Sequence, residues 1–196
     1  MLHFIGVYNY TVILTYLSLV SAVLGMVLAT KENFTAAILC LILCGICDAF
    51  DGTVARSKKD RTEDEKSFGI QLDSLCDSIS FGVFPVVLCY CMGTNSIFGI
   101  LCMCLFALCA VIRLAFFNVL EMKRQQTEGG SNKFYRGLPV TSISIIFPVV
   151  FLLRFVLPEQ YFIAVLHIML LLVAFLFVLD FKVRKPDWGK LLPIGK

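Results

Sequence analysis

Six runs of about 20 mostly apolar residues limit what this chain can fold into. Each run is long enough for one helix to cross the hydrocarbon core of a bilayer. With 59% hydrophobic and only 16% charged residues, the 196-residue chain lacks the polar material to cover a soluble domain. We therefore expect an all-α polytopic membrane protein with six transmembrane helices in a single domain, residues 1–196. The runs are Val7–Ala29, Phe34–Val54, Gly69–Met92, Ile97–Leu120, Leu138–Val156 and Tyr161–Phe181.

The basic residues between these runs predict how the helices are oriented. Fourteen Lys and Arg fall on one side of the expected membrane, and only Lys31 and Arg154 fall on the other. Cytoplasmic loops carry such an excess, so both termini and the loops around 56–66 and 123–136 are expected in the cytoplasm. Basic loops beside a bilayer typically face anionic lipid headgroups, and nothing here suggests a nucleic-acid partner.

Four aspartates interrupt the second and third apolar runs. The segment CDAFDGTVAR contains Asp48 and Asp51, and GIQLDSLCDSISFG contains Asp73 and Asp77. In a helix each pair shares one face, about 4.5 Å apart along the axis for the first pair and about 6 Å for the second. A carboxylate in hydrocarbon costs a few kcal/mol at least, so four at one level indicate a function.

The direction of the two helices predicts that these pairs meet. The second run approaches the cytoplasm and the third leaves it, so Asp48 and Asp77 are the deeper members of their pairs. Converging carboxylates repel one another unless cations lie between them, and hard oxygen ligands suit Mg²⁺ or Mn²⁺. Four can hold two ions about 4 Å apart. The alternative is a set of solvated helix-end carboxylates, which is plausible for Asp51 alone and poor for Asp77.

The residues after the first aspartate pair add features of a phosphate site. Gly52 allows another group to approach the backbone closely, and Arg56 offers a charged fork that fits phosphate. Farther along, Thr62 and Glu65 favour a capping box that would add a helical turn before the third run.

Together the two aspartate segments form the pattern D-x2-D-G-x2-A-R … G-x3-D-x3-D, from Asp48 to Asp77. This pattern resembles the signature of the CDP-alcohol phosphotransferases. The resemblance implies six-helix, usually dimeric membrane enzymes that move a phosphatidyl or similar group from a CDP-linked donor to an alcohol. Twelve residues separate Arg56 from Gly69, a longer gap than the family pattern usually has, and the additional residues fall in the polar loop.

The resemblance also implies a role for each residue of the pattern. Asp77 is the implied general base as well as a metal ligand. The implied cofactors are two divalent cations, Mg²⁺ or Mn²⁺. Implied metal ligands are Asp48, Asp51, Asp73 and Asp77, and implied nucleotide and phosphate contacts are Gly52, Ala55, Arg56 and Gly69.

Two further segments indicate a branch of the family. RLAFFNV (Arg113–Val119) and FYRGLPVT (Phe134–Thr141) resemble stretches of membrane-embedded phosphatidylserine synthases. This implies CDP-diacylglycerol and L-serine as substrates, phosphatidylserine and CMP as products, and a homodimer in a bacterial or archaeal cell membrane with its active site facing the cytoplasm. Arg113 and Arg136 are then candidates for binding the acceptor or a lipid phosphate. Arg113 needs an anionic partner, either the aspartates or a substrate, whereas Arg136 also fits a snorkelling interface residue.

Two other interpretations stay open from the sequence. The acceptor could be glycerol phosphate, an inositol phosphate or an amino alcohol, although a phosphorylated acceptor should demand more basic residues near the site. A cation-coupled or proton-coupled transporter could also use intramembrane aspartates. That reading leaves Gly52, Ala55 and Arg56 unexplained, and it predicts acidic residues along a path instead of in one patch.

Overall fold

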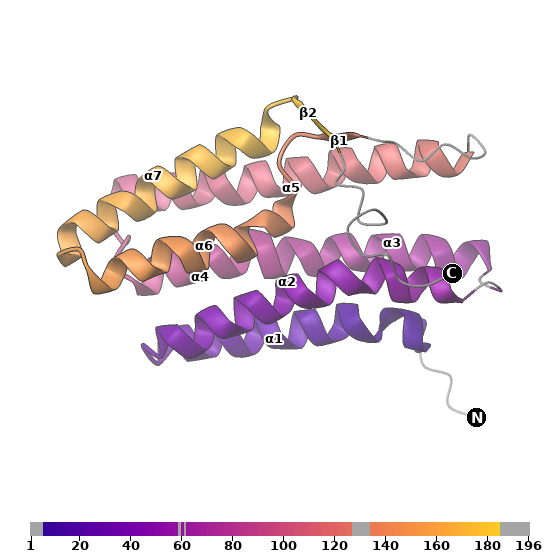
Figure 1. Cartoon of the computed structure of the whole chain (residues 1–196), viewed down its shortest axis with the longest axis horizontal. Coiled ribbons are helices and arrows are strands. Elements are labelled where there is room, and N and C mark those ends of the chain that lie inside the picture. The colour runs from indigo at the N-terminus through magenta and orange to yellow at the C-terminus, as the bar shows by residue number, and fades with distance from the viewer. Residues whose placement is uncertain (1–5, 59, 61, 127–133, 185–196) are drawn as a thin grey trace, which may run out of the picture.

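A computed structural model describes residues 6–58, 60, 62–126 and 134–184, and most of them are helical. Figure 1 shows the long helices lying side by side along the longest axis of the molecule. Short 3-10 turns at Tyr10–Val12, Val140–Ser142 and Leu153–Phe155 extend α1 and flank α6. The helices are α1 (Ile13–Thr30), α2 (Phe34–Ser57), α3 (Glu63–Asp77), α4 (Phe84–Cys91), α5 (Ile97–Gln126), α6 (Ile143–Leu152) and α7 (Glu159–Val178).

The expected all-helical membrane class is confirmed. Among the described residues, five helical stretches are long and apolar enough to cross a membrane. The fifth predicted run corresponds to a shorter apolar helix, Val140–Phe155, so the count of six spans and the side of the termini remain predictions. The five long stretches are Tyr10–Thr30, Phe34–Val54, Glu63–Cys91, Ile97–Leu120 and Glu159–Val178.

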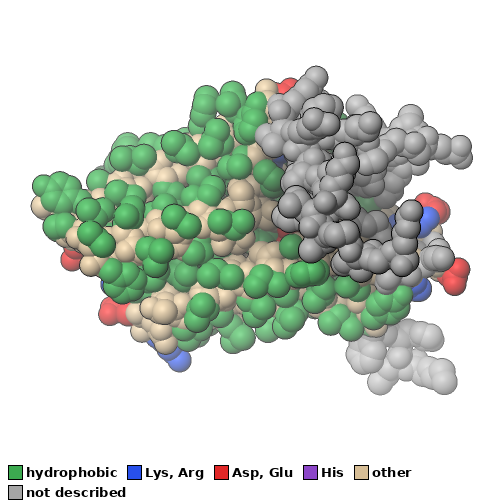
Figure 2. Space-filling model, viewed as in Figure 1, with side chains coloured by type: hydrophobic (Ala, Val, Ile, Leu, Met, Phe, Trp, Pro, Cys, Tyr) green, Lys and Arg blue, Asp and Glu red, His purple; other side chains and the backbone are tan. Residues whose placement is uncertain are grey.

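The outer surface is apolar along the flanks of the helices. Figure 2 shows hydrophobic side chains covering most of the visible surface of the described residues, with most of the visible charged side chains toward its two ends. Large residues such as Leu39, Leu101 and Phe175 are exposed on these flanks. Lipid tails are as apolar as these side chains, so the flanks suit a bilayer.

Inside, small residues bring the helices close together. α1 packs mainly against α2, and α5 mainly against α7. A Cβ atom added to Gly25 of α1 would lie 2.2 Å from Cζ of Phe84, so only glycine fits there. Phe81, Phe84 and Phe106 are fully buried and fill the space between the helices.

The third predicted span is one continuous helical stretch with a change of winding. α3 leads into a π-helical segment, Ser78–Val83, which leads into α4. Pro85 lies in the first turn of α4 and has no N–H to donate to the preceding turn, so a wider turn before it is physically reasonable. Asp77 is the last residue of α3 and therefore stands at this junction.

The start of α3 lies six residues before the predicted run, at Glu63. The predicted capping box is confirmed: the Thr62 hydroxyl accepts from the Glu65 N–H at 3.1 Å, and the Glu65 carboxylate accepts from the Thr62 N–H at 3.2 Å. The same carboxylate accepts from Lys58 Nζ at 2.9 Å and from Asn9 Nδ2 at 3.1 Å. Much of the additional length between Arg56 and Gly69 is therefore helix, tied to the end of α2.

Candidate functional site

Three of the four aspartates converge between α2 and α3. Asp48 comes from α2, and Asp73 and Asp77 come from the last turns of α3. One carboxylate oxygen from each lies within 4.8 Å of the others. The opposite directions of the two helices bring these side chains to the same level, as the sequence predicted.

The fourth aspartate, Asp51, is not part of this trio but interacts directly with Asp73. The Asp51 carboxylate accepts a hydrogen bond from the Thr15 hydroxyl of α1 at 3.5 Å. It interacts electrostatically with Asp48, Asp73 and Asp77, so the negative charges of all four carboxylates repel one another. Thr15 was not predicted as a neighbour of the site, because sequence spacing does not show which face of α1 meets α2.

The trio fits a hard divalent cation. Oδ1 of Asp73 is buried and has no hydrogen-bond partner, and Asp77 is only 9% exposed. A buried carboxylate oxygen without a donor is costly, and a bound cation would satisfy it. Carboxylate oxygens are the ligands that Mg²⁺ and Mn²⁺ prefer.

The predicted nucleotide and phosphate residues follow this cluster along the chain. Gly52 lies in α2 beside Asp51, and Gly69 lies in α3 one turn before Asp73. Ala55 and Arg56 belong to the last turn of α2, but their side chains lie outside the described part of the chain. Their predicted contacts therefore remain predictions.

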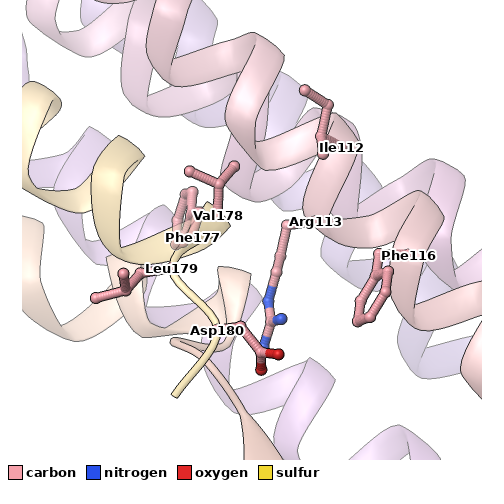
Figure 3. A pocket seen from close by; sticks show the side chains of 7 residues that line it. All are labelled: Ile112, Arg113, Phe116, Phe177, Val178, Leu179 and Asp180. Carbon is pink, nitrogen blue, oxygen red and sulfur yellow. The ribbon is translucent and has the colours of Figure 1, made fainter.

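Arg113 lies in α5 and is only 5% exposed. Its Nε donates to the Leu138 carbonyl at 3.1 Å, and its guanidinium lies 3.9 Å from the centre of the Phe117 ring. Figure 3 shows the Asp180 carboxylate, just after α7, directed toward the guanidinium, and the two charges attract one another. From the sequence, the expected partner of Arg113 was the aspartate cluster or a substrate. Asp180 could not be predicted, because no spacing rule links a position in α5 to one after α7.

A short strand pair holds this region together. β1 (Phe134–Arg136) pairs antiparallel with β2 (Lys182–Arg184), which ties the segment before α6 to the segment after α7. Gly137 follows β1 with a φ of +70°, and its N–H donates to the Phe181 carbonyl at 2.5 Å. An added Cβ there would lie 2.7 Å from the Leu179 carbonyl and 3.2 Å from Arg113 Nη1, so glycine is required. The backbone of Arg136 lies in β1, but its side chain is outside the described part.

Two contacts fix the register of α5 against the third span. The Ser74 hydroxyl donates to Oδ1 of Asn118 at 2.6 Å. Farther along, a Cβ on Gly82 would lie 3.6 Å from Cβ of Ala110. These antiparallel pairs place Arg113 opposite residue 79, about 3 Å along the axis from Asp77. The aspartate cluster and Arg113 therefore lie at nearly the same depth.

Comparisons with known proteins agree with this arrangement. A model of the CDP-alcohol phosphatidyltransferase family matches residues 8–179. The chain is 32% identical over 142 residues to a CDP-diacylglycerol–serine O-phosphatidyltransferase of Saccharomyces cerevisiae, covering 71% of this chain and 50% of that protein. It is 36% identical over 134 residues to an archaetidylserine synthase of Methanothermobacter thermautotrophicus, covering 68% and 54%.

A third relative is a CDP-diacylglycerol–serine O-phosphatidyltransferase of Mycobacterium tuberculosis, 30% identical over 127 residues, covering 64% of this chain and 43% of that protein. The chain thus spans about half the length of the curated relatives it matches. The family model, in contrast, extends over nearly all of the described helices and includes the four aspartates. On this match, the chain belongs to the CDP-alcohol phosphatidyltransferase family.

Proposed function

We propose that this chain transfers a phosphatidyl group from CDP-diacylglycerol to L-serine, giving phosphatidylserine and CMP. The observation that carries the proposal is the convergence of Asp48, Asp73 and Asp77 inside an apolar helix bundle. One carboxylate oxygen of Asp73 is buried there without a hydrogen-bond donor. The serine-specific names of several relatives support the choice of acceptor.

The proposed cofactors are two divalent cations, Mg²⁺ or Mn²⁺. Asp48, Asp51, Asp73 and Asp77 are their proposed ligands, since the four carboxylates interact electrostatically. Bound there, such cations would neutralise charge on the donor's diphosphate and on the departing CMP.

The transfer step exchanges one P–O bond for another. The serine hydroxyl oxygen attacks the phosphorus that carries the diacylglycerol, and the bond from that phosphorus to the bridging oxygen breaks, so CMP leaves with that oxygen. Asp77 takes the proton of the attacking hydroxyl during bond formation. Asp77 ends α3 where the π-helical segment begins, and π-helical turns frequently occur at functional sites.

The remaining predicted residues would orient the two substrates. Gly52, Ala55, Arg56 and Gly69 are proposed to line the nucleotide and phosphate pocket beside the aspartates. Arg113 and Arg136 are proposed to bind the acceptor carboxylate or a lipid phosphate. The burial of Arg113 and its depth near Asp77 support the first of these assignments.

The proposal includes the membrane setting. The distribution of Lys and Arg supports an active site facing the cytoplasm. The archaeal and mycobacterial relatives support a bacterial or archaeal cell membrane. The family resemblance supports a homodimer, which chemical cross-linking of the purified protein in lipid nanodiscs would test.

The decisive experiment measures CMP release by the purified chain with CDP-diacylglycerol, Mg²⁺ or Mn²⁺, and one acceptor at a time. We expect CMP release with L-serine and little with glycerol phosphate, an inositol phosphate or ethanolamine. Preference for one of those three would overturn the acceptor assignment. Ion flux across liposomes without any CMP release would favour the transporter interpretation instead.

A further inference from the structure

A pocket of about 220 Å³ opens beside Arg113, between α5 and the end of α7 (Figure 3). Its walls are mostly apolar, and its charged groups are Arg113, which is buried, and Asp180, which is exposed at the rim. The lining residues are Ile112, Arg113, Phe116, Phe177, Val178, Leu179 and Asp180.

The two charged groups lie next to each other at this pocket. Figure 3 shows the carboxylate of Asp180 directed toward the guanidinium of Arg113, and their charges attract. An α-amino acid carries a carboxylate and an ammonium group on a single carbon. A pocket that presents a cation and an anion side by side therefore matches an α-amino acid with a charge-assisted contact for each group.

The pocket also lies at the level of the proposed chemistry. The contacts Ser74–Asn118 and Gly82–Ala110 place Arg113 about 3 Å along the axis from Asp77. The guanidinium is anchored from outside the pocket by the Leu138 carbonyl and the Phe117 ring. A fixed cation at this depth can hold an acceptor in a defined orientation.

We propose that Asp180 binds the ammonium group of a zwitterionic amino-acid acceptor while Arg113 binds its carboxylate. The inference rests on the proposed function and assigns a specificity-determining residue to it. Arg113 alone would select any hydroxyl acid, whereas the pair selects a hydroxyl amino acid. Because Asp180 is exposed, an acceptor that enters the pocket from solvent can contact its carboxylate before it reaches the buried Arg113.

The test compares L-serine with 3-hydroxypropionate, which has the same hydroxyl and carboxylate but no ammonium group. In Asp180→Asn we expect kcat/KM for L-serine to fall by about ten-fold or more, because a charge-assisted contact is lost. The kcat/KM for 3-hydroxypropionate and the KM for CDP-diacylglycerol should not change. Asp180→Glu should restore part of the serine preference. Glu159→Gln, which removes an exposed carboxylate from the other end of α7, is the matched control.

Other results would overturn the inference. An equal loss for both acceptors would mean that Asp180 only orients Arg113. Unchanged serine kinetics would exclude the contact, and a raised KM for CDP-diacylglycerol alone would assign the pair to the donor's diphosphate.

A binding measurement separates this inference from the proposed function. L-alanine has both charged groups of serine but no hydroxyl, so it should raise the unfolding temperature of the wild-type protein and not that of Asp180→Asn. Propionate should act equally on both proteins. If L-alanine binds in this way but L-serine yields no CMP, the pocket assignment stands and the transfer proposal fails. Equal stabilisation of both proteins by L-alanine would overturn the pocket assignment.

Discussion

Gly45 of α2 faces Ser144 of α6 so closely that a Cβ atom on Gly45 would lie 2.1 Å from the serine Oγ and 2.7 Å from its Cβ. The Ser144 hydroxyl donates to the Thr141 carbonyl at 2.7 Å, one turn back along the chain. α6 is the shorter apolar helix of the bundle, and this contact holds it against α2. Because Gly45 lies one turn before Asp48, the same contact positions the face of α2 that carries this aspartate.

Gly45→Ala should therefore destabilise the protein by about 1–3 kcal/mol, because the added methyl group overpacks the crossing of α2 and α6. Thermal unfolding in detergent or nanodiscs measures this loss. Gly82→Ala is the matched control, since its Cβ would lie 3.6 Å from Ala110, an ordinary contact distance. Adding Ser144→Gly should recover part of the loss at Gly45, and equal effects of the two alanine variants would contradict the explanation.

A second prediction concerns the hydrogen bond between the aspartate helix and the arginine helix. Removing the bond from Ser74 to Asn118 should cost about 0.5–1.5 kcal/mol and loosen the register that sets Arg113 at the depth of Asp77. A double-mutant cycle with Ser74→Ala and Asn118→Leu measures the coupling free energy by thermal unfolding. Additive effects of the two variants would show that the bond does not contribute.

A third prediction concerns the metal. Mg²⁺ or Mn²⁺ should raise the unfolding temperature, because a cation that binds only the folded protein stabilises it and relieves repulsion among the carboxylates. Asp73→Asn should abolish this rise, since its unpartnered oxygen lies in the cluster. Asp64→Asn, in the exposed first turn of α3, is the control. Excess EDTA should stop CMP release, and full turnover in EDTA would contradict the metal assignment.

Much of this arrangement follows from local rules of helix geometry. Residues three and four apart share a helix face, so the pairing of Asp48 with Asp51 and of Asp73 with Asp77 could be predicted from spacing alone. The capping box at Thr62 is likewise a local pattern, and it is present. Apolar length predicted the membrane helices, because the thickness of the bilayer fixes how long a span must be.

Two features of the site that the sequence did not predict depend on packing between distant segments. Asp180 meets Arg113 because α7 packs along α5 and because β2, just after Asp180, pairs with β1. Thr15 reaches Asp51 because one particular face of α1 packs on α2. Helical periodicity places a residue on a face of its own helix but does not show which neighbour that face meets.

A fourth prediction tests orientation. Asp64 and Asn95 lie near opposite ends of the α3–α4 stretch, roughly 40 Å apart for a helix of that length. In a variant without the nine native cysteines, Asn95→Cys should react with a membrane-impermeant maleimide in intact cells. Asp64→Cys should react only after permeabilisation, because basic loops stay in the cytoplasm. The reverse pattern would contradict the predicted topology.

The last prediction separates two roles of Asp77, which is the most buried of the four aspartates and stands where α3 gives way to the π-helical segment. If Asp77 is chiefly the proton acceptor, Asp77→Asn should lower the rate of transfer by roughly 10² or more while CDP-diacylglycerol and Mg²⁺ still bind. If it is chiefly a ligand, the same variant should lose metal-dependent stabilisation, as Asp73→Asn does. Single-turnover CMP release, measured beside the metal-induced rise in unfolding temperature, distinguishes the two. An amide keeps the size of the carboxylate, so Asp77→Asn changes charge and not packing. If this variant loses both CMP release and the metal-induced rise in unfolding temperature, Asp77 is assigned to the metal and the proton acceptor is another group.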